Sequence, residues 1–395
     1  MPISYCLVPN LRFSYKGDWS KRKLNEICQF FKGNGLSKSD LSNEGFPCIL
    51  YGELYTTYKN EVIRDIISKT NTALSNPFLS RNNDLIIPGS GEDPIDIAVA
   101  RAIYQNDIIL GGDLNILRPK SNVSAAFLSY QLNGVRRYDI AKKAQGKSIV
   151  HLHNSDLKEV LVSIPTYDEQ LHIVKLLTKI DEMIETQSKI IKKYESLIKS
   201  IEEKILWKGN DSSYVPIKDF LIEKNEKSTI QDQYPVLSST VKGLFLQSDY
   251  FQREVASSNN IGYKITKLND IIISPQNLWM GNITYNDKFE NGIVSPSYHI
   301  YEIRDGYNKQ YIATILKSYK ALYRYKSISE QGASVVRRNL NMDAFLDITF
   351  PIPSKRKQDE AGMIIQQLHL KLDVENQYLD SLFSQKTYFL NNMFI

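Results

Sequence analysis

The chain has 395 residues, enough for two to four domains that each bury a core of their own. Apolar residues make up 42% and charged residues 24%, a balance typical of globular proteins, and the net charge of +5 permits a polyanionic partner without demanding one. No run of about 18 apolar residues occurs, so the sequence predicts neither a membrane span nor a secretory signal. Three widely spaced cysteines argue against a disulfide framework or a cysteine-based zinc site, and we expect a cytoplasmic protein without a structural metal.

The sequence repeats itself over almost its whole length. A shift of 186 residues aligns Asn83–Ile87 with Asn269–Ile273, and it also aligns Gln145-Gly146 with Gln331-Gly332. After a two-residue insertion in the second copy the shift becomes 188 and continues to the end of the chain. The later matches include Leu152 with Leu340, Pro165 with Pro353 and Gln170 with Gln358.

Each copy begins with a mixed α/β region. Short apolar runs between turn residues predict strands; these runs are residues 84–89, 107–112, 114–119, 270–274 and 298–303. Residues 127–144 and 310–327 have the apolar spacing of helices. The Gly- and Asn-containing segment 207–216 ends in proline and separates the two copies.

Each copy ends in a heptad pattern. Apolar residues recur in alternating steps of four and three from Ile173 to Ile205, and the second copy keeps the same phase from Ala361 to Met393. One such stripe is equally typical of an ordinary amphipathic helix, but two stripes in the same phase favour a coiled coil between them. A helix from Asp168 to Leu206 would span about 58 Å. The predicted seam contains Ile173, Leu177, Ile180, Ile184, Ile191, Ile198, Ile365, Leu368, Leu372, Leu379, Leu382 and Phe389.

No segment carries a convincing catalytic or cofactor motif. Gly146–Ser148 resembles the end of a phosphate-binding loop, but Ala141 stands where that loop requires a glycine. His151 and His153 could ligate a metal, yet their counterparts in the second copy are asparagines, which bind transition metals poorly. A surface or hydrogen-bonding role is therefore favoured for this pair. The two-fold design indicates binding rather than catalysis.

Both copies are basic where they resemble each other most. Lysine and arginine neutralise phosphates, and arginine, glutamine and asparagine can read base edges through two hydrogen bonds. A solvated helix face explains one such cluster, but its recurrence favours contact with nucleic acid. The candidate DNA-binding residues are Ser90, Arg136, Arg137, Lys142, Lys143, Gln145, Lys147 and Ser148 in the first copy, and Gln276, Asn277, Arg324, Lys326, Gln331, Ser334, Arg337 and Arg338 in the second.

Two readers joined by a stiff coil suit a split DNA site. Half-sites on one face of B-DNA lie about 34–36 Å apart or a multiple of that distance. A coil of the predicted length could set such a spacing. Two diverged readers would select an asymmetric site, and two equal readers would select a palindrome.

This organisation resembles the specificity subunit of type I restriction–modification systems over nearly the whole chain. The resemblance is carried by residues 9–27, 88–97, 111–119, 144–152 and 164–177, in that order and spacing. It implies two tandem target-recognition domains with pseudo-two-fold symmetry, at residues 1–165 and 208–353. The two spacer helices, residues 166–207 and 354–395, would pack as an antiparallel coiled coil.

The resemblance also implies a division of labour. Each domain would bind one half of a bipartite DNA target, and two methyltransferase subunits would methylate adenine with S-adenosylmethionine. Restriction subunits using ATP and magnesium would join them, while this chain would bind neither cofactor and catalyse nothing. The second copy departs from the first at Lys357, which replaces Glu169, and at Lys386 in the seam. Two rival hypotheses remain, a coiled-coil protein–protein adaptor and a nuclease with an unrecognised site.

Overall fold

The computed structural model describes residues 8–208, 212–250, 259–331 and 338–395. The chain forms two compact units, the first made of residues up to 189 together with 377–395, and the second of residues 190–376. Helices α7 (Tyr167–Trp207) and α13 (Lys355–Asn392) each contribute one half to each unit. Within the described residues, no helix is long and apolar enough to cross a membrane.

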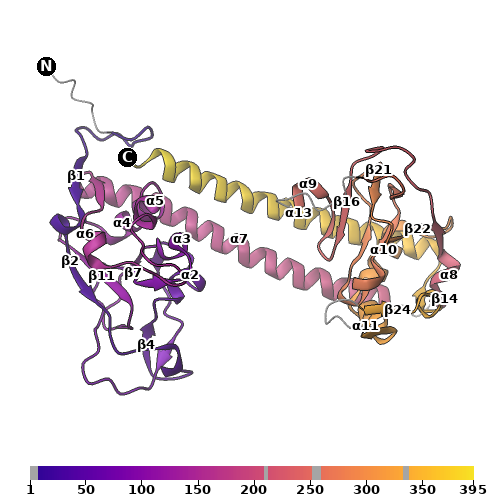
Figure 1. Ribbon diagram of the computed structural model, residues 1–395, viewed down its shortest axis with the longest axis horizontal. Helices are drawn as coiled ribbons and strands as arrows, with labels where there is room; N and C mark the ends of the chain where they lie inside the picture. The colour runs from indigo at the N-terminus through magenta and orange to yellow at the C-terminus, as the bar shows by residue number, and fades with distance from the viewer. Residues whose placement is uncertain (1–7, 209–211, 251–258, 332–337) are drawn as a thin grey trace. The chain divides into compact units, whose positions relative to one another are not determined.

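The first unit is built around a five-stranded sheet in the order β2-β11-β7-β9-β5 (Figure 1). A smaller sheet, β10-β4-β6-β3, lies at one end of the same unit, and β1 pairs with β13 just before α7 begins. The elements are β1 Ser20–Lys23, α1 Leu24–Ile27, β2 Cys28–Lys32, η1 Lys38–Asp40, β3 Leu41–Ser42, β4 Phe46–Ile49, α2 Glu53–Thr56, β5 Val62–Ile63, β6 Lys69–Thr70, β7 Asp84–Pro88, β8 Ser90–Gly91, α3 Pro94–Ile97, β9 Arg101–Ile103, β10 Ile109–Leu110, β11 Leu114–Pro119, α4 Ala125–Asn133, α5 Arg137–Ala141, β12 Val150–His151, α6 Asn154–Lys158 and β13 Leu161–Ile164.

The second unit repeats this plan with a four-stranded sheet in the order β15-β22-β19-β20. Strand β14 pairs with β25 just before α13 begins, as β1 pairs with β13 before α7. The elements are β14 Ser213–Pro216, α8 Ile217–Phe220, β15 Leu221–Lys224, β16 Leu237–Thr240, β17 Gly243–Leu246, α9 Gln247–Tyr250, β18 Lys264–Lys267, β19 Ile271–Ile273, η2 Pro275–Met280, β20 Ile283–Tyr285, β21 Asn291–Val294, β22 His299–Ile303, α10 Lys309–Lys317, α11 Tyr319–Ser327, β23 Ser329–Gln331, β24 Arg338–Leu340, α12 Met342–Leu346 and β25 Thr349–Ile352.

The repeated Asn-Asp sequence forms the same turn in both units. Asn83 and Asn269 have φ values of 70° and 74°, the left-handed conformation that asparagine tolerates well. Each following aspartate is buried and paired with a cation: Asp84 binds Arg118 through two bonds of 2.8 Å, and Asp270 binds Lys224 at 3.0 Å. The need for an asparagine in the left-handed turn and for a buried, paired aspartate explains why the motif occurs twice at the start of a central strand.

The repeated glutamine makes the same two backbone hydrogen bonds in each unit. The side chain of Gln170 accepts a hydrogen bond from the backbone nitrogen of Ser124, the N-cap of α4, and donates one to the carbonyl of Pro165. Gln358 makes the same two contacts with Asn308, the N-cap of α10, and with Pro353. Both glutamines are buried, so each fixes the start of a long helix against the helix that covers its sheet.

The two helices expected within the units are each divided into two. Residues 127–144 form α4 and α5, separated at Gly134, and residues 310–327 form α10 and α11, separated at Ser318. The Ser318 hydroxyl caps α11 by accepting from the backbone nitrogen of Ala321, which makes a new helix start there favourable. The prediction of single helices was therefore wrong, because the apolar spacing continues across both breaks.

Helices α7 and α13 run antiparallel where they pack. In the first unit Ile180 and Ile184 of α7 form a cluster with Leu382 of α13, and in the second the carboxylate of Glu202 lies 2.7 Å from the ring of His369. Every residue of the predicted seam is buried or half-buried, although Ile173 and Leu177 also join the main core of the first unit. Burial of a leucine or isoleucine contributes about 1.5–3 kcal/mol, so the seam is a large share of the stabilisation of both helices.

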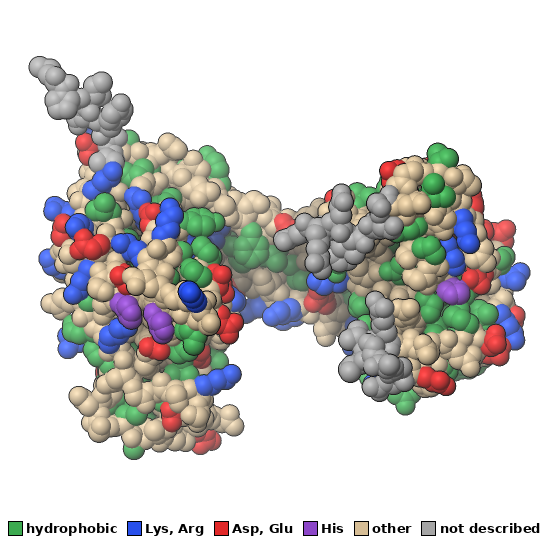
Figure 2. All heavy atoms as spheres, in the orientation of Figure 1, with side chains coloured by type: hydrophobic (Ala, Val, Ile, Leu, Met, Phe, Trp, Pro, Cys, Tyr) green, Lys and Arg blue, Asp and Glu red, His purple; other side chains and the backbone are tan. Residues whose placement is uncertain are grey.

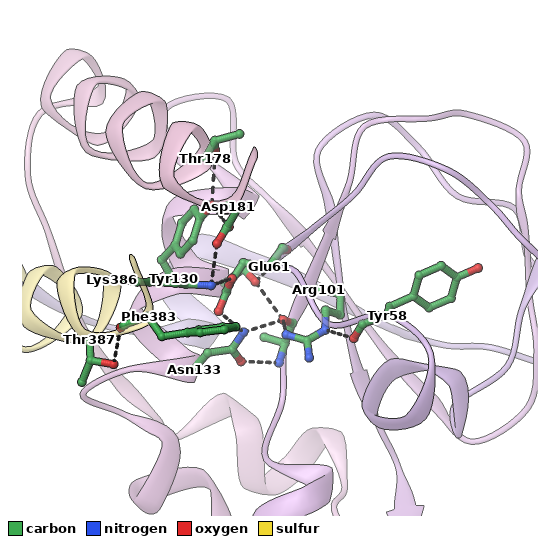
Figure 3. Close-up of polar contacts among 12 residues, drawn as sticks. Tyr58, Glu61, Arg101, Tyr130, Asn133, Thr178, Asp181, Phe383, Lys386 and Thr387 are labelled. Atoms are coloured by element: carbon green, nitrogen blue, oxygen red, sulfur yellow. Dashed lines mark hydrogen bonds and ion pairs between the residues drawn. The ribbon is translucent and has the colours of Figure 1, made fainter. Parts of the chain in front are cut away.

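Lys386 is a charged residue in this seam, and the first unit surrounds it with oxygen atoms (Figure 3). Its ammonium lies 2.7 Å from Asp181 on α7 and 2.6 Å from Glu61, and all three side chains are largely buried. The hydroxyl of Tyr130 donates to the other oxygen of Asp181 at 2.6 Å. Burial acts to lower the pKa of Lys386, but the two carboxylates outweigh it, so this pKa lies above its ordinary value. The charged lysine is thus held in one position relative to α7 and the sheet region.

Asp181 should make the stability of the protein depend on pH. Burial and then the nearby Glu61 raise the pKa of Asp181 despite the bond from Lys386. A carboxyl whose pKa is raised on folding contributes stability that is lost as the pH rises from about 4 through the folded pKa. Asparagine does not titrate, so D181N should not lose this stability. Its free energy of unfolding should therefore increase relative to that of wild type as the pH rises from about 4 through the folded pKa of Asp181. Urea unfolding of both proteins at a series of pH values measures the difference, and a constant difference would contradict this assignment.

Candidate nucleic-acid interface

The repeated Gln-Gly motif forms a hairpin in the first unit. Gln145 and His151 exchange two backbone hydrogen bonds, with lengths of 2.9 and 2.7 Å, and we call residues 145–151 the first hairpin. Gly146 has a φ of 138°, and a Cβ atom there would lie 2.0 Å from the carbonyl oxygen of Ile149. The tight turn therefore requires glycine at this position. Lys147 and Ser148 are exposed at its tip.

The first hairpin is paired with the segment that follows the central strand β7. His151 lies opposite Ser90 in the β8–β12 pair, and the backbone nitrogen of Leu152 donates to Gly89. The Ser90 hydroxyl is buried and bonds to Asp113 at 3.2 Å. The structure thus brings the predicted residues Ser90 and Gln145 to either side of His151.

The second unit has a corresponding strand pair that includes Gln331 of its own motif. Strands β23 and β24 pair antiparallel with Gln331 opposite Arg338, and we call these two strands, residues 329–331 and 338–340, the second hairpin. It packs against η2, which follows the central strand β19 and carries Gln276 and Asn277. Ser334 and Arg337 lie outside the described residues, as does the side chain of Gln331. In both units, the hairpin and the segment after the central strand lie together.

Several predicted basic residues are accessible. Lys142, Lys147 and Lys326 are exposed, and Lys143 is half-buried in the turn between α5 and the first hairpin. Figure 2 shows exposed histidines on the first unit, with both basic and acidic side chains around them. The exposed lysines near the Gln-Gly motif therefore offer positive charge to a polyanion.

Arg136 and Arg137 are instead bound to backbone oxygens of the first unit. Arg136 donates to the carbonyl of Ile395 at 2.9 Å, and Arg137 donates to that of Ile95 at 3.1 Å. The nearby Asp139 forms a further ion pair with Arg136. The structure gives both arginines a role within the fold, and their contact with DNA stays a prediction.

Arg324 is similarly engaged in the second unit. Its guanidinium donates to the carbonyl of Thr349 and lies 5.2 Å from the ring centroid of Trp207 and 5.7 Å from that of Phe350. These rings belong to the end of α7 and to β25, so Arg324 joins the helix to the sheet region. Charge reversal there would disturb packing as well as any DNA contact, which makes Arg324 an unsuitable probe of recognition.

Sequence reasoning missed two groups beside the hairpins. The rings of His151 and His153 are stacked, with centroids 6.1 Å apart and planes 1° apart, and both side chains are exposed. In the second unit the guanidinium of Arg338 lies 4.3 Å from the ring centroid of Trp279. The sequence favoured a surface or hydrogen-bonding role for the His-x-His pair over a metal site but did not place it beside the hairpin, and among the described residues no cluster of three metal-ligating side chains occurs. No sequence signal pairs Trp279 with Arg338.

Comparison with known proteins agrees with this arrangement. Residues 16–196, which include the first hairpin, match the family described as Type I restriction modification DNA specificity domain. The part of the chain that carries the first hairpin and the start of α7 is thus similar to this family. One curated member, the putative type I restriction enzyme MjaX specificity subunit of Methanocaldococcus jannaschii, is 24% identical over 208 residues. That match covers 49% of this chain and 46% of the relative, so the chain spans about half the length of the curated relative it matches.

Two solved structures share the fold over almost the full length. The type I restriction–modification S subunit from M. genitalium has a TM-score of 0.61 and 18% identity, with 98% of this chain and 99% of that chain covered. A chain from a structure of type I R-M complex assembly and conformational transition has a TM-score of 0.57 and 13% identity, with 96% and 98% covered. The mixed α/β architecture with two long helices, expected from the sequence, is thus confirmed, and these two solved structures share that fold.

Proposed function

We propose that this chain is a DNA sequence-specificity subunit and that each unit recognises one half of a bipartite site. The observation that carries the proposal is the repetition of one local structure. In both units a hairpin that includes the glutamine of the repeated motif lies against the segment that follows the central strand. Two copies of one binding device in a single chain suit a target with two parts.

The two long helices would serve as the spacer between the readers. Helix α7 has 41 residues and α13 has 38, so each is about 60 Å long. In this proposal the target-recognition domains are residues 1–165 and 208–353, and the spacer helices are residues 166–207 and 354–395. The base contacts come from the hairpins and their neighbouring segments, and the exposed lysines contact phosphates.

The chemistry would come from partner subunits. Two methyltransferase subunits would bind S-adenosylmethionine and methylate adenine, and restriction subunits would use ATP with magnesium. The present chain would contribute only the choice of DNA sequence, within a cytoplasmic complex. The coiled-coil adaptor is the competing function, and it requires no affinity for DNA.

DNA binding by the complex of this chain with its methyltransferase subunit should weaken steeply as salt increases. Each neutralised phosphate contributes about 0.9 to the slope of log affinity against log salt. We expect K147E to reduce this slope by about one or two, because Lys147 is exposed at the tip of the first hairpin, whereas K38E in η1 should leave it unchanged. Fluorescence anisotropy over a salt series measures the slope, with the methyltransferase subunit alone as the baseline. A slope equal to that baseline would favour the adaptor.

A further inference from the structure

The pair formed by Trp279 and Arg338 is the closest contact between a cation and an aromatic ring in the part of the chain that the structure describes. The guanidinium carbon of Arg338 lies 4.3 Å from the ring centroid, whereas the other such contacts range from 5.0 to 5.8 Å. Arg338 opens β24 of the second hairpin, and Trp279 lies in η2, which packs against that strand. The ring therefore supports the arginine at the place where hairpin and η2 meet.

Arg338 differs from the other half-buried arginines because no hydrogen-bond acceptor contacts its guanidinium within the part of the chain that the structure describes. Arg12 and Arg118 each bind a carboxylate through two bonds, and Arg136, Arg137 and Arg324 donate to backbone carbonyls. The Nε atom of Arg338 is buried without a hydrogen-bond partner among the described residues, and its guanidinium forms no ion pair there. A half-buried guanidinium that lies over a ring and has no acceptor among the described residues is an arrangement that a binding site explains better than a folding role does.

The indole restricts the guanidinium. The guanidinium carbon lies over the ring, so the terminal nitrogens have fewer directions open to them than on a free side chain. The edge of a guanidinium matches the O6 and N7 atoms of guanine, which accept two parallel hydrogen bonds in the major groove. Gln276 and Asn277 lie on the same short helix as Trp279, so the predicted polar readers are its neighbours.

We propose that Arg338 reads a guanine in the half-site bound by the second unit, with Trp279 as the positioning residue that holds its guanidinium. This proposal rests on the proposed function, because it assigns one base contact within that DNA site. A phosphate contact by the same arginine is the alternative, and it would contribute affinity without sequence preference.

The test is the methylation motif of variants. The chain is expressed with its methyltransferase subunit in a host that lacks DNA methylation, and methylated adenines are mapped by single-molecule sequencing. We expect R338A to lose the requirement for one G·C pair in one half-site, with discrimination at that pair reduced about 5- to 150-fold. W279A should relax the same pair to a smaller extent, W279F should preserve it, and the double variant should be no more relaxed than R338A.

R304A is the matched control, because Arg304 is an exposed arginine of the same unit and its loss removes the same charge. Its motif should equal that of wild type. If R338A fails to fold, R338M keeps the stem packed on the indole and should show the same relaxation.

Uniformly weaker methylation with an unchanged motif in R338A or R338M would overturn the proposal. Relaxation at an A·T pair would also overturn it. If the wild-type complex produces no motif at all, the proposed function fails instead, so the two failures are distinguishable.

Discussion

The K386A variant is expected to lose about 3–5 kcal/mol of unfolding free energy at neutral pH. Lys386 is only 15% exposed, and its removal leaves the carboxylates of Asp181 and Glu61 buried together without their cation. Urea unfolding at pH 7 measures the loss. The loss should shrink as the pH falls, because Asp181, whose pKa is raised by burial and then by Glu61, takes up a proton and the repulsion is relieved.

Two comparison variants make this expectation specific. Lys371 also forms an ion pair within α13, with Glu375, but it is 53% exposed, so K371A should change stability by less than about 1 kcal/mol. The triple variant E61Q/D181N/K386M removes every charge of the cluster and should recover much of the stability that K386A loses. K386A as stable as K371A would show that the buried cluster does not anchor α13 to the first unit.

The G146A variant is expected to abolish recognition of the half-site read by the first unit. A methyl group at residue 146 would lie 2.0 Å from the carbonyl oxygen of Ile149, so the first hairpin must open to accommodate it. Misplacement of Gln145 and Lys147 should lower methylation at wild-type sites about 10-fold or more, since each base contact provides about 1–3 kcal/mol of discrimination. Mapping of methylated adenines measures this loss and should show the second half-site still defined.

G17A is the matched control for the glycine substitution. Gly17 also has a positive φ, 92°, but nothing lies within 4 Å of the Cβ that alanine would add. Both variants are destabilised because alanine is unfavourable at positive φ, and only G146A adds the clash within the first hairpin. Equal methylation motifs in the two variants would contradict the role of the first hairpin.

The repeat in the sequence predicted much of the fold because its matched residues have local tasks. Asn83 and Asn269 form the same left-handed turn, and Gln170 and Gln358 bind the same two kinds of backbone atoms. When backbone geometry or a buried polar contact requires one residue type, that residue stands at the same position in both copies and can be recognised in the sequence. The heptad seam is predictable for the same reason, since its spacing follows directly from the helix.

The candidate site was less predictable because the sequence does not show whether a charged side chain is exposed to solvent or bound within the fold. Lys147 and Arg324 both count toward a basic cluster, yet one is exposed at a hairpin tip and the other is bound to Thr349. Only packing between distant segments decides between these outcomes. Lys386 was recognisable as an unusual seam residue, but its partner Glu61 lies 325 residues away in the sequence. The stack of Arg338 on Trp279 depends on tertiary structure in the same way.

The wild-type methylome tests recognition of a split DNA site most directly. The chain is expressed in a methylation-free host with the methyltransferase subunit proposed as its partner, and every modified adenine is mapped. Recognition of one half-site by each unit predicts one bipartite motif, with two short defined halves separated by a gap of fixed length. A single undivided motif, or no motif despite a complex that forms, would contradict recognition of one half-site by each unit.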